Sequence, residues 1–166
     1  MAYLLHQLLI DSAAQRPDQE AVVFENRCIT YRELDALSNR LAHALRSGGV
    51  TPGDRVGIYL NKCIESVVAI AGIHKAGAAY VPLDPGAPVR RIAFIVGNCA
   101  MKALISSGQK AAGLAEALPA AGPLQCLVLA EAKAPSQAPA LGGARTVTWD
   151  QVLQMPDSPP PASGRT

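Results

Sequence analysis

The chain has 166 residues, of which 49% are hydrophobic and 17% charged, and its formal net charge is +2. This length fits one domain or part of a larger protein, and the apolar fraction excludes disordered and fibrous classes. The basic residues are scattered, so we expect no nucleic-acid-binding stripe and no polybasic membrane anchor.

The most apolar stretch, residues 64–83, is interrupted by Glu65, His74 and Lys75, which argues against a membrane span. Residues 4–10 are also apolar, but no basic region precedes them and no small-residue cleavage site follows them. They therefore do not resemble a secretory signal. We expect no membrane partner and a cytoplasmic location.

The N-terminal region predicts a helix followed by a hairpin. Leu5, Leu8 and Leu9 recur at helical spacing before Pro17, which predicts an amphipathic helix over residues 4–16. Two short apolar runs, residues 21–24 and 28–30, then predict a hairpin that turns at residues 25–27.

The strongest local signals predict a helix over residues 31–47. Thr30 and Glu33 have the spacing of a capping box, and Gly48 and Gly49 end the segment. A buried stripe is expected at Leu34, Leu37, Leu41 and Leu45.

The middle of the chain alternates between strand and helix patterns. Residues 55–60 predict a strand covered on both faces, and Asn61 is expected to cap a deeply packed helix that runs to Lys75. Residues 79–83 predict a strand that ends, or lies at an edge, because of Pro82. Residues 84–86 predict a turn.

Three further strand or helix patterns follow a helix that starts at Pro88 and runs through Asn98. They are a strand at residues 103–105, a helix at 111–118 and a strand at 124–129. This alternation predicts an α/β fold with a mostly parallel sheet.

The composition changes after residue 130, and we divide the chain there into an α/β part, 1–130, and a loop and proline-rich linker, 131–166. Residues 133–143 are expected to form an exposed loop. Residues 148–153 are expected to form a helical turn that docks Trp149 on the core. Beyond Met155 we predict a flexible tail.

A search for reactive motifs finds no G-x-S-x-G, H-E-x-x-H, P-loop or G-x-G-x-x-G pattern, and we predict no catalytic, cofactor-binding or metal-binding residues. His6, His43 and His74 are expected at helix ends or on the surface. The widely spaced cysteines predict free thiols rather than a disulfide framework or a metal site: Cys28, Cys63, Cys99 and Cys126.

One strand–helix junction lies where α/β proteins often bind phosphate, but it lacks the several glycines of a phosphate-binding loop. Residues 106–110, Ser-Ser-Gly-Gln-Lys, lie where a strand is expected to meet a helix, so helix amides there could face an anion. A structural role is favoured over a phosphate-binding role.

Two segments carry a family resemblance. Residues 29–34, Ile-Thr-Tyr-Arg-Glu-Leu, and residues 75–85, Lys-Ala-Gly-Ala-Ala-Tyr-Val-Pro-Leu-Asp-Pro, resemble segments near the start of the AMP-forming adenylating enzymes. This superfamily includes acyl-CoA synthetases and the adenylation domains of nonribosomal peptide synthetases. The resemblance covers about residues 4–130, and both segments belong to the family's scaffold. The start of the chain is more similar to an acyl-CoA ligase and residues 78–85 to a peptide-synthetase domain, so both types stay open.

The resemblance implies an enzyme that uses ATP and Mg²⁺ to convert a carboxylic acid to an acyl-adenylate and passes it to coenzyme A or a carrier-protein thiol. The family's Ser/Thr/Gly-rich phosphate loop ending in Pro-Lys-Gly does not occur in this sequence. Residues 163–166, Ser-Gly-Arg-Thr, are only superficially similar to it and are expected to be linker.

We therefore expect an N-terminal fragment of such a ligase that is inactive alone and needs no cofactor of its own. Two alternatives are a non-catalytic interaction module, or split subunit, that pairs with a complementary chain, and a flavodoxin-type nucleotide binder.

Overall fold

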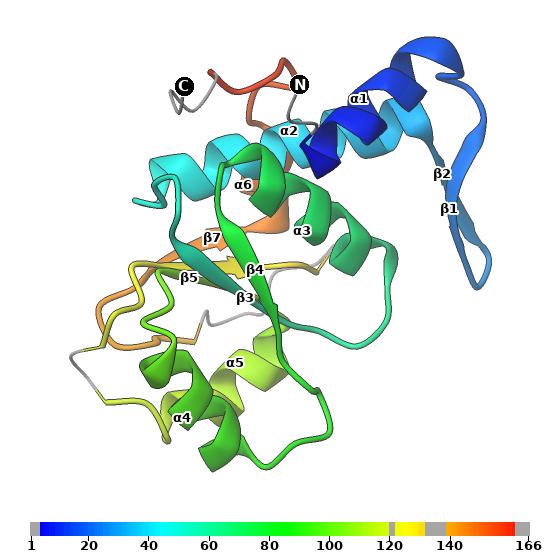
Figure 1. The fold of residues 1–166 in the computed structure, drawn as a ribbon. Coiled ribbons are helices and arrows are strands. Elements are labelled where there is room, and N and C mark those ends of the chain that lie inside the picture. The colour runs from blue at the N-terminus through cyan, green and yellow to red at the C-terminus, as the bar shows by residue number, and fades with distance from the viewer. Residues whose placement is uncertain (1–3, 120–121, 132–138, 162–166) are drawn as a thin grey trace.

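The computed structural model describes residues 4–119, 122–131 and 139–161. In these ranges the chain alternates between helices and strands around one parallel sheet, as Figure 1 shows. The elements are α1 Leu5–Gln15, β1 Glu20–Phe24, β2 Arg27–Thr30, α2 Tyr31–Ser47, β3 Arg55–Tyr59, α3 Ile64–Lys75, β4 Ala79–Pro82, α4 Val89–Asn98, β5 Ala103–Ser106, α5 Gly108–Ala115, β6 Cys126–Leu129, β7 Arg145–Thr148 and α6 Trp149–Leu153.

The main sheet has five parallel strands in the order β4-β3-β5-β6-β7, and β1 and β2 form a separate antiparallel pair. The predicted α/β class and parallel sheet are confirmed. Pro82 lies in β4, the edge strand, where a residue without an N–H is tolerated.

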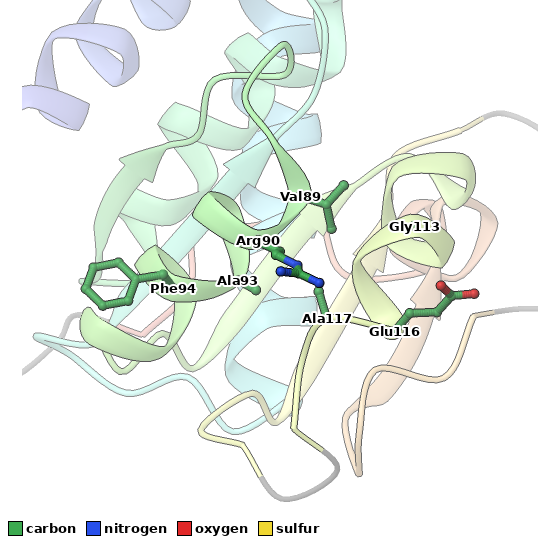
Figure 2. Close-up of a pocket in the computed structure, with 7 residues that line it drawn as sticks. All are labelled: Val89, Arg90, Ala93, Phe94, Gly113, Glu116 and Ala117. Carbon is green, nitrogen blue, oxygen red and sulfur yellow. The ribbon is translucent and has the colours of Figure 1, made fainter.

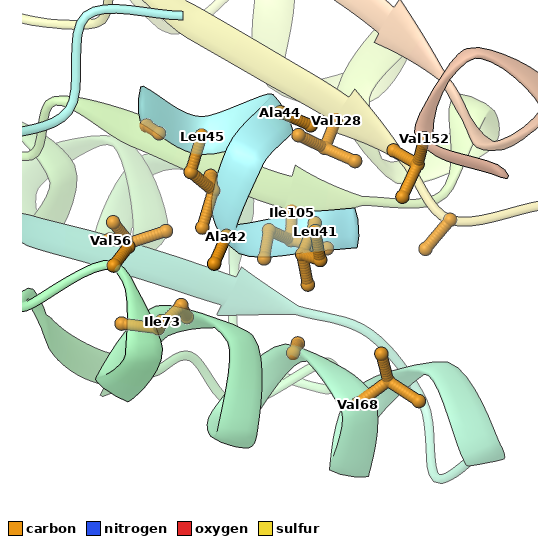
Figure 3. Close-up of a cluster of buried hydrophobic side chains, with 14 of the residues drawn as sticks. Leu41, Ala42, Ala44, Leu45, Val56, Val68, Ile73, Ile105, Val128 and Val152 are labelled. Carbon is orange, nitrogen blue, oxygen red and sulfur yellow. The ribbon is translucent and has the colours of Figure 1, made fainter. Parts of the chain in front are cut away.

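Two layers of helices cover the two faces of this sheet. Successive residues of a strand point to opposite faces, so in β5 Ile105 joins one buried cluster and Leu104 the other. The first cluster packs against α2, α3 and α6, and Figure 3 shows Leu41, Ile73 and Val128 among its side chains. The second cluster packs against α4 and α5 through Ile92, Val96 and Leu114.

The capping box that starts α2 is present as predicted. The Thr30 hydroxyl accepts from the Glu33 amide at 3.3 Å, and the Glu33 carboxylate accepts from the Thr30 amide at 2.7 Å. The Leu34, Leu41 and Leu45 side chains are buried and Leu37 packs against them, so the expected stripe is confirmed.

Several element ends differ from the prediction. Asn61 does not cap α3, because the helix begins at Ile64 and Cys63 is its N-cap, where the Ser66 hydroxyl donates to the Cys63 carbonyl at 2.6 Å. Helix α5 begins at Gly108, three residues before the predicted start, because Ser107 caps it.

Helix α1 has no buried residue, and Leu5 and Leu8 are 69% and 54% exposed, although Leu9 packs against the core. The amphipathic pattern therefore predicts helix α1 correctly, but the apolar face of this helix is largely uncovered in the structure.

Strand β7 lies beyond residue 130 and was not predicted. It pairs with β6 and leads directly into α6, whose Trp149 is docked as expected at 6% exposure.

Residues 133–138 of the predicted loop and 163–166 of the predicted linker lie outside the described residues, whereas Leu141 is buried. Residues 156–161 also differ from a flexible tail, because they contact α2 through the hydrogen bonds given below. The division at residue 130 stays a prediction.

Candidate functional site

The sheet topology indicates one edge where a ligand would be expected. The chain moves from β3 to β4 on one side and then back across to β5 on the other side, so the helices that follow the neighbouring strands β3 and β5 lie on opposite faces of the sheet. Counted from β3, this is the order 2-1-3-4-5 of flavodoxin-like sheets, whose ligands bind at that switch point. Tyr59 and Ser106 are the last residues of these two strands.

The polar groups at the switch point bind one another. The Ser106 hydroxyl, which is fully buried, donates to the Tyr59 carbonyl at 3.1 Å. The Lys110 ammonium lies 5.0 Å from the centre of the Tyr59 ring and donates to the Pro85 carbonyl at 3.0 Å. These contacts join β3, β5, α5 and the turn after β4 into a closed arrangement.

Residues 106–110 do form the predicted strand–helix junction, but a side chain of the protein already lies at the helix N-terminus. The Ser107 hydroxyl accepts from the Lys110 amide at 3.3 Å, and the Gly108 amide donates to a Glu131 carboxylate oxygen at 3.0 Å. Glu131 is thus placed where an anionic ligand would have to bind. Sequence reasoning missed Glu131, because no local pattern links it to Gly108.

A groove of about 780 Å³ runs between α4 and α5 (Figure 2). Arg90 extends from α4 toward Ala117, whereas Glu116 points away from it, and Phe94 is 69% exposed. Both charged residues are exposed to solvent, so neither is held in place for recognition. The groove is lined by Val89, Arg90, Ala93, Phe94, Gly113, Glu116 and Ala117.

The histidines lie on helices, as predicted, and two of them share one surface. His6 of α1 and His74 of α3 line an apolar groove of about 330 Å³, where His74 makes an edge-to-face contact with Tyr80. Burial lowers the pKa of His6, and the charges of His74 and Lys75 lower it further. The groove joins α1 and α3 to the edge strand β4, and Ile70 and Tyr80 are more than one-third exposed.

The cysteines are free thiols, as predicted. Burial raises the pKa of Cys63, and it raises the pKa of Cys126 to about 11, so both remain protonated at neutral pH. Within residues 4–119, 122–131 and 139–161, no group of three or more His, Cys, Asp or Glu side chains is placed to hold a metal ion. In the same ranges, no helix is long and apolar enough to cross a bilayer.

The two segments behind the family resemblance have structural positions. Residues 29–34 end β2 and cap α2, while residues 75–85 end α3 at Gly77, whose φ is +83°, and form the edge strand β4. A positive φ favours glycine, which explains the residue at this turn. Together with the sheet order, they define a doubly wound α/β scaffold.

Comparison with known proteins identifies the family to which this scaffold belongs. The sequence model of the AMP-binding enzyme family matches residues 9–164. The chain therefore belongs to the AMP-binding enzyme family.

Relatives of known sequence are peptide synthases. N-(5-amino-5-carboxypentanoyl)-L-cysteinyl-D-valine synthase of Streptomyces clavuligerus is 46% identical over 113 residues, which are 66% of this chain and 14% of that protein. Syringomycin synthase SyrB1 of Pseudomonas syringae pv. syringae is 41% identical over 137 residues, 82% of this chain and 21% of its own. This chain thus spans about a fifth or less of these relatives.

Solved structures have the same fold. A nonribosomal peptide synthetase, FmoA3, superposes with a TM-score of 0.71 at 28% identity over 96% of this chain and 15% of its own. A putative long-chain-fatty-acid CoA ligase from Rhodopseudomonas palustris gives 0.76 at 24% identity, over 95% of this chain and 37% of its own. Because its identity to this chain is only 24%, the similarity to the CoA ligase shows a shared fold and nothing more.

Proposed function

We propose that this chain is the N-terminal scaffold of a ligase that converts an acyl or amino acid to an acyl-adenylate with ATP and Mg²⁺ and passes it to a thiol. The match of the family model to residues 9–164 is the observation that supports this proposal. The peptide synthases at 41–46% identity favour an amino acid and a carrier-protein thiol, with coenzyme A as the other acceptor. We place the protein in the cytoplasm, without a nucleic-acid or membrane partner.

The chain alone is proposed to be inactive and to bind no cofactor by itself. Acyl-adenylate formation needs donors and a metal ion preorganised around the transferring phosphate. The sequence contains no Pro-Lys-Gly loop, and the groups at the switch point, Ser106, Lys110 and Glu131, are engaged with protein partners. Under this proposal residues 4–119, 122–131 and 139–161 supply a folded platform, and the reacting groups come from other polypeptide.

A chimera tests the scaffold role. Residues 9–161 would replace the matching part of SyrB1, and pyrophosphate exchange would be measured with whichever amino acid supports exchange by unchanged SyrB1 under the same conditions. We expect exchange by the chimera and none by the 166-residue chain or by SyrB1 without its matching part. Pyrophosphate exchange by the chain alone would refute the proposal that it is inactive. A folded but inactive chimera would refute the scaffold role.

A complementary chain is the second candidate, in which this protein is an interaction module or split subunit. The observation that favours it is the apolar surface around α1, α3 and β4, where Leu5, Ile70 and Tyr80 are exposed. Co-expression with the SyrB1 remainder distinguishes the two candidates. Exchange activity without covalent fusion would support a split subunit, while activity only in the fused chimera would support a scaffold.

A further inference from the structure

The last described residues lie along α2, as Figure 1 shows in orange and red beside the cyan helix. Four side chains of α2 approach main-chain carbonyls at the end of α6 and in the segment that follows it. Asn39 Nδ2 donates to Asp157 O at 2.7 Å and Arg40 Nη1 to Leu153 O at 2.8 Å. His43 Nε2 lies 3.1 Å from Ser158 O, and Arg46 Nη1 donates to Pro161 O at 2.6 Å.

The donors lie along α2 in the same order as their acceptors along the segment. Asn39, His43 and Arg46 are related as i, i+4 and i+7, which places them on one face of the helix. Their acceptors, Asp157, Ser158 and Pro161, follow in the same order, so the segment runs alongside the helix in the same direction.

The sequence of the segment suits this role. Pro156, Pro159, Pro160 and Pro161 have fixed φ angles and no N–H. The segment belongs to no helix or strand, so its carbonyls are free to accept from a neighbouring surface. An Arg40–Asp157 ion pair of 3.6 Å further fixes the register.

The segment is also connected to the core. Pro159, Pro160 and Pro161 line a cavity of about 240 Å³ together with Ile10 of α1 and the buried Lys75. Asn39 is only 2% exposed and bridges the two sides, because its Nδ2 binds Asp157 O while its Oδ1 accepts from Lys75 Nζ at 2.8 Å. Asn39 is therefore held from the core side by Lys75.

We propose that one face of α2, formed by Asn39, Arg40, His43 and Arg46, is a binding site for a proline-rich segment, and that the protein's own residues 156–161 fill it. Through this contact α2 fixes the position of Pro161. The inference does not depend on adenylation activity, so it stands or fails separately from the proposed function.

The order of the segment in the full chain tests the proposal. Asp157 and Ser158 carry amides, and their NMR order parameters should equal those of a rigid backbone, about 0.85. In the triple variant Arg40→Ala/His43→Ala/Arg46→Ala, they should fall below about 0.6. Asn39 is kept because it also binds Lys75, and the α2 amides in the same spectrum report on folding. Mobile amides in the unchanged chain, or ordered ones in a folded triple variant, would overturn the proposal.

Arg32→Ala is the matched control, since it removes an exposed α2 arginine that binds Asp18 rather than the segment. A second measurement tests recognition directly. In a chain whose residues 156–161 are replaced by six Gly and Ser residues, a peptide of residues 154–161 at about 5 mM should shift the Asn39 and Arg46 signals. This concentration is comparable to that of a tethered segment. No shift, or an equal shift with the three alanine substitutions, would contradict a binding site on α2.

Discussion

Lys75 of α3 and Asp35 of α2 form an ion pair of 2.5 Å across the interface between the two helices. The Lys75 ammonium also donates to the Asp35 carbonyl at 3.0 Å and to Asn39 Oδ1 at 2.8 Å, so each of its three hydrogens has an acceptor. Burial lowers the pKa of Lys75 and the charge of Asp35 opposes this shift. Lys75 is therefore a structural residue that links α3 to α2, and not a reactive amine.

Replacing this lysine with Lys75→Met should destabilise the fold by about 1–3 kcal/mol. The loss leaves Asp35 and Asn39 without their partner, and it is smaller than for a fully buried pair because the Asp35 side chain is 24% exposed. Urea denaturation gives the change in the free energy of unfolding. Lys62→Met, at an exposed lysine, is the control and should change it by less than about 0.5 kcal/mol. Equal effects of the two substitutions would contradict the structural role.

Local signals predicted the bounds of α2, residues 31–47, because a capping box and a leucine stripe act within a few turns. Strand β7 could not be predicted in that way. Of its four residues only Val147 is buried, and it becomes a strand by pairing with β6. The N-cap of α3 was misplaced because Cys63, an unusual cap residue, is supported by the Ser66 hydroxyl.

The site features depend on longer separations still. Glu131 and Gly108 are 23 positions apart, and the contacts from Asn39 and His43 to the C-terminal segment span 118 and 115 positions. A single sequence has no periodicity at such distances. The family resemblance could identify the scaffold because its two segments are local, but it could not place the polar groups that fill the switch point.

Removing the cap of α2 with Thr30→Ala should cost about 1 kcal/mol of stability. The substitution leaves the Glu33 amide without the hydroxyl that it now donates to at 3.3 Å. Thr30→Ser keeps that acceptor and should retain most of the stability, as measured by thermal and urea unfolding. If serine and alanine were equally destabilising, the lost methyl group rather than the cap would explain the effect.

Adding one methyl group at Gly72 should destabilise the contact between α3 and α2 by about 1–2 kcal/mol. A Cβ there would lie 2.9 Å from Leu41 Cδ2, closer than real Cβ contacts come, and 3.0 Å from Leu41 Cβ, closer than most of them. This overpacking outweighs the gain of about 1 kcal/mol that alanine has over glycine in a helix.

Gly97→Ala in α4 is the matched control, because a Cβ at that position has no heavy atom within 4 Å. Only the helix propensity then changes, so this variant should gain about 0.5–1 kcal/mol. The two variants should therefore shift the midpoint of urea unfolding in opposite directions. Gly72→Ala with unchanged or increased stability would show that Leu41 can move aside.

The thiol of Cys126 should make stability fall as the pH rises from 9 to 11. Burial raises its pKa from 9.0 to about 11 in the folded chain, although Arg145 lowers it slightly. Between these values the unfolded chain has lost the proton and the folded chain has kept it. The free energy of unfolding therefore decreases with pH, by about 2 kcal/mol between pH 8 and pH 10.5. Cys126→Ala removes this contribution while other titrating groups remain, so its difference from the unchanged chain isolates the thiol. Urea unfolding at the two pH values should show the unchanged chain losing about 2 kcal/mol more than the variant, and parallel losses would mean that this thiol is not buried as described.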